Sequence, residues 1–181
     1  MMVKHWVDNN FQKLVEIRRW LHQHPEVGFD ENETSQYCQN FMKDLGFEIY
    51  QTEPMKTGFY CDYGNGNGST LAVRCDLDAL PIQEVNSFDY SSVNPGVSHA
   101  CGHDAHMTNI MGLATYIIET EQNIPGTLRF LFQPAEEIAP GGAVVMIEGG
   151  GIDGVDHIIG GHILPSLSPM KVGIRYGAMA A

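Results

Sequence analysis

The stretch Ser98-His99-Ala100-Cys101-Gly102-His103-Asp104-Ala105-His106 gathers three histidines, a cysteine and an aspartate within nine residues. Thiolate, imidazole and carboxylate groups all bind transition metals. In an extended segment, residues two apart point the same way, and the intervening glycine lets a ligand approach the backbone. We therefore expect Cys101 and His103 to face one ion. A buried thiol beside a helix-capping histidine is the alternative for a lone C-x-H triplet.

Length, composition and charge are typical of a soluble globular protein. The chain has 181 residues, 43% of them hydrophobic and 18% charged, so residues 1–181 can bury a sizeable core as one domain. The net charge of -12 argues against nucleic acid as a partner, because phosphate binding needs a basic face. No apolar run reaches the roughly 18 residues of a membrane span, so we expect no membrane partner.

The N-terminus and the cysteines bear on the compartment. The first residues lack the apolar centre and the small-residue cleavage site of a signal peptide. The four cysteines are widely spaced and show no disulfide framework. We therefore expect a cytoplasmic protein.

The first half of the chain shows two helical patterns followed by short apolar runs. Apolar spacings of three and four predict a helix over residues 8–22, capped by Asp8 or Asn9, and a second one over about 31–46. Strands are expected over residues 47–50, 58–63 and 70–75. The glycine-rich segment 64–68 predicts a tight hairpin turn between the last two of these strands.

The second half alternates helices and strands. Helices are expected over residues 103–120 and 141–148, and strands over 127–132 and 156–163, with one further strand possible over 171–176. This order predicts an α/β fold with a mixed sheet and helices on both faces.

Each later strand ends in polar or ionisable residues. In open α/β sheets, ligand sites form outside the carboxyl ends of the strands. We therefore expect these groups to converge on Cys101 and His103, although they lie far away in sequence. They are Asp76, Asp78, Glu136, Glu137 and His162.

The adjacent acids Glu136 and Glu137 suit metal-assisted hydrolysis, because they would point in different directions at a strand end. One could ligate an ion while the other acts as the base toward a water. A solvated acidic pair on a loop is the alternative, which the apolar strand before them weakens.

The other acids and histidines carry weaker signals. Asp76 or Asp78 could hold a ligating histidine in position, or could cap a turn before Pro81. A lone histidine at a strand end, such as His162, is more often packed than a ligand. We assign His22, His24, His99 and His157 mainly to packing or capping.

Other catalytic motifs are absent from the sequence or lie in the wrong context. The glycines at 149–154 satisfy G-x-G-x-x-G but follow a helix, the reverse of the dinucleotide-binding context. No G-x-S-x-G nucleophile elbow occurs. A cysteine hydrolase, with Cys101 as nucleophile and His103 or His106 as base, remains an alternative, although it would not need the glutamate pair.

At these residues the sequence resembles the aminoacylase and hippurate-hydrolase branch of the dinuclear metallo-amidohydrolases, which includes N-acetyldiaminopimelate deacetylase. Five matching stretches in the same order make the resemblance specific. They are residues 17–26 (IRRWLHQHPE), 74–82 (RCDLDALPI), 99–106 (HACGHDAH), 132–137 (FQPAEE) and 161–162 (GH). The resemblance implies a three-layer α/β/α, zinc-peptidase-like catalytic domain with a mixed central sheet.

The resemblance also implies roles for single residues. Glu136 matches the general base of the family, and Asp78 matches an aspartate that supports the metal centre. The positions that match its metal ligands are Cys101, His103, Glu137 and His162. Such enzymes hydrolyse the amide bond of N-acyl amino acids or small peptides with two divalent ions, here zinc or manganese, or else nickel or cobalt.

One departure from the family pattern is large. Members of the family are considerably longer and insert a lid and dimerisation domain after a segment like residues 173–181. We therefore expect this chain to be the first part of the catalytic domain of a homodimeric protein, with a further metal-ligating histidine supplied from outside it. The alternative is a non-catalytic metal-binding or regulatory fragment, inactive without the missing half.

Overall fold

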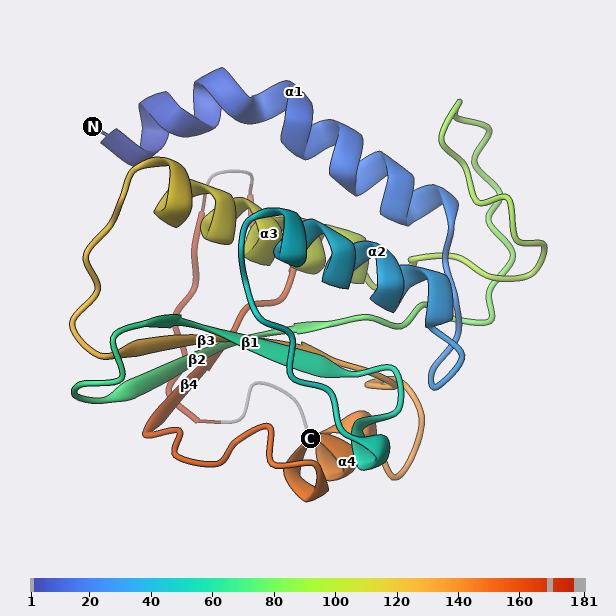
Figure 1. Cartoon of the computed structure of the whole chain (residues 1–181). Coiled ribbons are helices and arrows are strands. Elements are labelled where there is room, and N and C mark those ends of the chain that lie inside the picture. The colour runs from blue at the N-terminus through green and yellow to red at the C-terminus, as the bar shows by residue number, and fades with distance from the viewer. Residues whose placement is uncertain (1, 169–170, 178–181) are drawn as a thin grey trace.

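The computed structural model describes residues 2–168 and 171–177. Two α-helices come first, and strands and helices alternate in the second half of the chain (Figure 1). The elements are α1 (Met2–Gln23), α2 (Asn32–Asp44), the short 3-10 helix η1 (Glu53–Met55), β1 (Phe59–Gly64), β2 (Thr70–Asp76), α3 (His103–Glu119), β3 (Thr127–Gln133), α4 (Gly142–Glu148) and β4 (His157–Gly160). Among these described helices, none combines the length and apolarity needed to cross a membrane.

The four strands form one mixed sheet in the order β1-β3-β2-β4. β3 pairs antiparallel with β1 and parallel with β2, and β4 pairs parallel with β2. The predicted hairpin at residues 64–68 is therefore wrong, because β3 lies between β1 and β2. β3 is buried along almost its whole length, and a strand buried on both faces takes a central position in a sheet.

Helices cover both faces of the sheet. Figure 1 shows α1, α2 and α3 on one face and α4 on the other. The main core lies under the three helices, where the rings of Phe59 and Phe132 stack at a centroid distance of 4.4 Å. A smaller apolar cluster, which includes Met55 and Met146, lies on the α4 side. The predicted α/β fold with a covered mixed sheet is confirmed.

The first helix begins earlier than the sequence predicts. α1 starts at Met2, so Asp8 and Asn9 lie inside the helix and cap nothing. Its first turns are held by a distant contact, in which the indole Nε1 of Trp6 donates a hydrogen bond to Glu119 at 2.7 Å. Local spacing does not reveal a partner so far along the chain.

Three strand predictions also need correction. Of residues 47–50, only Tyr50 pairs, in an isolated bridge with Tyr60. β4 covers His157–Gly160 rather than 156–163, and residues 171–177 contain no strand. β4 is paired on one side only and its side chains are exposed, so fewer contacts extend it.

The turn after β3 depends on a glycine at the start of α4. A Cβ atom at Gly142 would overlap the carbonyl oxygen of Pro134, which is backbone and cannot move aside easily. We expect Gly142→Ala to lower the free energy of unfolding by about 3 kcal/mol. Urea unfolding measures this loss. Gly160→Ala is the matched control, since open space surrounds that position, and equal midpoints for the two variants would contradict the expectation.

Candidate metal centre

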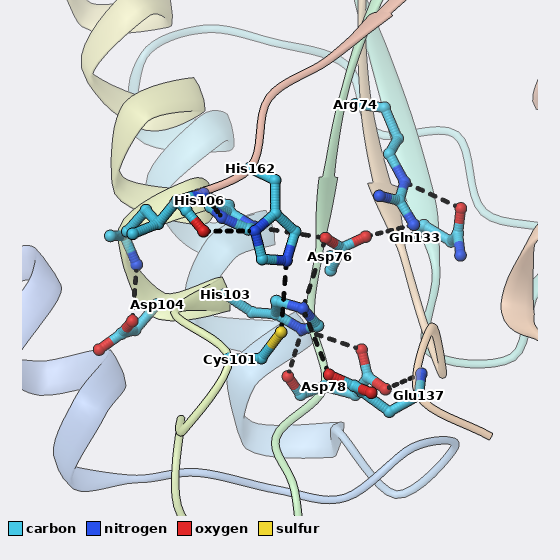
Figure 2. Close-up of polar contacts among 12 residues, drawn as sticks. Arg74, Asp76, Asp78, Cys101, His103, Asp104, His106, Gln133, Glu137 and His162 are labelled. Atoms are coloured by element: carbon cyan, nitrogen blue, oxygen red, sulfur yellow. Dashed lines mark hydrogen bonds and ion pairs between the residues drawn. The ribbon is translucent and has the colours of Figure 1, made fainter. Parts of the chain in front are cut away.

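The three parallel strands deliver their following residues to one edge of the sheet, beside the first turn of α3. β2 leads to Asp76 and Asp78, β3 to Glu137, and β4 to His162. Figure 2 shows these side chains gathered around His103. The convergence predicted from the strand ends is therefore present in the structure.

His103 lies at the centre of this group and is fully buried. Its Nδ1 lies 2.8 Å from the main-chain oxygen of Asp78, which can only accept, so Nδ1 carries the proton. In the neutral ring, Nε2 is then the unprotonated acceptor. It lies 3.6 Å from Asp76 Oδ2 and 3.8 Å from Glu137 Oε1, and none of the described residues gives it a hydrogen bond.

Without a cation, the polar groups in this arrangement repel one another. A lone pair faces two carboxylate oxygens in a buried place, and each of these groups would be stabilised by positive charge between them. The same three atoms are common ligands of divalent metals. The residues present therefore fit a divalent metal ion.

Cys101 approaches His103 by a different route from the one predicted. The sequence suggests an extended triplet, but Gly102 has a φ of 91° and His103 is already the first residue of α3. A positive φ of this size suits glycine, which has no Cβ to clash. The Cys101 Sγ lies 3.3 Å from Nε2 of His162.

Among the residues that the structure describes, three sets of side chains each bring their ligand atoms within 4.8 Å of one another, and His103 belongs to all three. The sets are Cys101, His103 and His162; Asp76, His103 and His106; and His103, Glu136 and Glu137. These sets contain every residue that the sequence predicts as a ligand, and they provide donors for more than one ion. The individual roles remain predictions.

His106 is held in a supporting position. Its Nε2 accepts a hydrogen bond from the Ile163 backbone N–H at 3.0 Å, which leaves the proton on Nδ1. Nδ1 faces Asp76 Oδ2 at 3.4 Å. His106 thus links Asp76 to the segment that carries His162.

Asp78 organises two of the neighbouring groups. Its Oδ2 accepts a hydrogen bond from the Glu137 backbone N–H at 2.9 Å, and its Oδ1 lies 3.3 Å from Nδ1 of His103. Burial alone would raise the pKa of Asp78, but the hydrogen bonds from His103 and from the Glu137 and Glu136 backbones lower it overall. Asp78 therefore orients both His103 and the backbone segment that carries Glu136 and Glu137.

Negative charge dominates the centre in the absence of a cation. Burial first, and then the Glu137 carboxylate, raise the pKa of the Cys101 thiol to about 12. Burial lowers the pKa of His103, but its contacts with Asp78 and the charge of Asp76 raise it overall. Neither His103 nor His106 is hydrogen-bonded to the Cys101 sulfur among the described residues, which weighs against the cysteine-hydrolase alternative.

Glu136 and Glu137 differ in exposure and in their contacts, while their roles as base and ligand stay predictions. The Glu137 side chain is 23% exposed and reaches His103, whereas Glu136 is exposed. No hydrogen bond holds the Glu136 side chain within residues 2–168 and 171–177. Its carboxylate is available to a water or substrate beside the cluster.

A second polar network, which the sequence does not reveal, supports the start of α3. Asp104 is fully buried, accepts a hydrogen bond from Nδ1 of His22 at 2.7 Å and forms an ion pair with Nε of Arg18 at 3.0 Å. His22 also contacts Glu84 at 3.1 Å. The hydrogen bond with Asp104 raises the pKa of His22. The prediction of a packed role for His22 fits this network, but its partners lie too far along the chain to be predicted.

Comparisons with known proteins identify relatives of this chain. The sequence profile of Peptidase family M20/M25/M40 matches residues 72–177. N-acyl-L-amino acid amidohydrolase of Geobacillus stearothermophilus is 43% identical over 180 residues, or 99% of this chain and 48% of that protein. N-acetyl-L-cysteine deacetylase of Bacillus subtilis is 41% identical over 94% of this chain and 41% of that protein.

Solved structures share the fold. A dinuclear metal-binding peptidase of family M20 from Bacillus subtilis superposes with a TM-score of 0.81 at 41% identity, covering 86% of this chain and 44% of that one. The chain spans about half the length of the curated relatives it matches.

Proposed function

Because the chain belongs to Peptidase family M20/M25/M40, we propose that it supplies most of the metal centre of an amidohydrolase that cleaves N-acyl amino acids or small peptides. The single observation that carries this proposal is the Nε2 atom of His103, directed at two carboxylates without a hydrogen-bond partner among the described residues. The relatives named as an amidohydrolase and a deacetylase support the substrate class.

The proposed roles follow the positions of the side chains. Cys101, His103, Glu137 and His162 would hold two divalent ions, and Asp78 would fix the ring of His103. Thiolate, imidazole and carboxylate ligands together suit zinc or manganese, with nickel and cobalt as further candidates. When bound, such ions supply Lewis acidity, which lowers the pKa of water and polarises an acyl carbonyl.

Glu136 would move the proton. Its carboxylate takes a proton from the attacking water and later passes it to the nitrogen of the leaving amine, so the products are a carboxylate and a free amino group. His103 and Glu137 would remain ligands of the ions throughout. The protein would act in the cytoplasm as a homodimer.

Metal removal tests the proposal. In the longest natural protein that contains this sequence, a chelator is expected to reduce hydrolysis of N-acetyl and N-benzoyl amino acids to the uncatalysed level. Readdition of zinc or manganese should restore it, because the water loses its activation only while the ions are absent. Turnover that survives complete metal removal, measured by elemental analysis, would exclude the proposal.

A non-catalytic metal-binding protein is the second candidate, favoured by the greater length of the relatives. Elemental analysis and the amidase assay separate the two candidates. Bound metal without turnover would support the non-catalytic one.

A further inference from the structure

The backbone turns a corner at residues 135–137, which carry both glutamates, and its conformation there is unusual. Ala135, directly before Glu136, has a φ of 45°, in the left-handed region that residues with a Cβ rarely adopt. Such a conformation persists only when its surroundings hold it. The corner therefore needs anchors, and its direction decides where Glu136 and Glu137 point.

One anchor is a buried carboxylate from the other end of the chain. Glu31, at the start of α2, is fully buried, and its Oε1 accepts a hydrogen bond from the Ala135 backbone N–H at 2.7 Å. Its Oε2 accepts a hydrogen bond from the Thr57 hydroxyl at 2.6 Å. Burial raises the pKa of Glu31, while the hydrogen bonds from Thr57 and Ala135 counter the rise.

Further contacts close the corner from the remaining sides. The Ala135 carbonyl accepts a hydrogen bond from the Gly142 backbone N–H at 2.8 Å. Gly28 packs so closely that a Cβ there would meet the Ala135 Cα at 3.0 Å. After the corner, the Glu137 N–H is held by Asp78. Glu31 is the one carboxylate side chain among these contacts that holds Ala135 itself.

We infer that Glu31 is a positioning residue for the metal centre, fixing the Ala135 backbone so that Glu137 faces His103 and Glu136 stays beside them. The inference rests on the proposed function for the roles of these two glutamates. Glu31 touches neither of their carboxylates. It acts through the Ala135 N–H, and its loss should change metal binding and kcat more than substrate binding.

The test compares Glu31→Ala with two matched variants. Glu31→Gln keeps an oxygen for the Ala135 N–H and offers its amide to the Thr57 hydroxyl. Thr57→Val removes the other hydrogen bond to the same buried carboxylate and leaves the Ala135 contact intact. If the role of Glu31 is purely structural, Glu31→Ala and Thr57→Val should differ only in the free energy of unfolding.

We expect Glu31→Ala to weaken zinc affinity by about 10–100-fold and to lower kcat by a similar factor, with KM changed less than about twofold. Glu31→Gln and Thr57→Val should stay near wild type in both zinc affinity and kcat. Competition with a chromophoric chelator measures affinity, and urea unfolding shows that each variant is folded. If Glu31→Ala does not fold, Glu31→Leu replaces it, since leucine fills the volume without an acceptor.

The outcomes separate this inference from the proposed function. Equal zinc affinity in wild type and Glu31→Ala would overturn the inference, as would equal losses in Glu31→Ala and Thr57→Val. A wild-type protein without amidase activity would sink the proposed function alone, because zinc affinity still reports on the role of Glu31.

Discussion

Replacement of Glu136 by glutamine is expected to lower kcat by about 10²–10⁴-fold while the bound metal remains. Glutamine has nearly the same shape as glutamate but cannot take a proton from water. The exposed Glu136 side chain has no hydrogen bond to lose among the described residues, so the fold should be unaffected. Turnover of N-acetyl amino acids and the metal content of the same preparation measure the two effects.

Glu148→Gln provides the matched control for this prediction. Glu148 is an exposed glutamate at the end of α4, and the same chemical change there should leave kcat within about twofold of wild type. Retained turnover in Glu136→Gln would assign the proton transfer to another group. Loss of metal in that variant would instead make Glu136 a ligand.

The position of the metal centre follows from short-range patterns in the sequence. Asp76 ends one strand, Glu137 and His162 follow two others, and parallel strands end at one edge. This rule needs only the strand boundaries and directions. It does not need the order of the strands, which explains why the convergence was predicted although the hairpin at 64–68 was wrong.

The order of the strands depends on burial that local sequence does not show. A glycine-rich segment between two apolar runs favours a hairpin, yet β3 arrives from residues 127–133 and takes the central place between them. Its apolar side chains on both faces gain more from that place than β2 would gain by pairing with β1. Such a comparison needs the whole fold.

The supporting residues escaped prediction for the same reason. Glu31 looks like an ordinary acid at a helix start, but its partner Ala135 lies 104 residues away. Asp104 and His22 are separated by 82 residues. A buried acid can be inferred from sequence only when its partner is near, because most charged residues are exposed.

Replacement of His103 by alanine is expected to have a large effect on metal binding. His103 belongs to all three sets of converging ligand atoms, whereas His162 belongs to one. Because Nδ1 of His103 holds a proton, only Nε2 can bind metal, and a single lone pair binds one ion. We therefore expect His103→Ala to weaken the affinity for one of the two ions by at least about 100-fold, more than the loss of a supporting residue causes. His162→Ala should weaken the affinity for one of them only.

Elemental analysis after dialysis against a fixed zinc concentration measures these losses, with two ions expected in wild type and about one in each of His103→Ala and His162→Ala. His157→Ala, at an exposed histidine on β4, controls for the loss of an imidazole elsewhere. Unfolding curves of the metal-free proteins show whether the variants fold. A folded His103→Ala protein that still held two ions would mean that Nε2 of His103 is not a ligand, and that the carboxylates and Cys101 bind the metal without it.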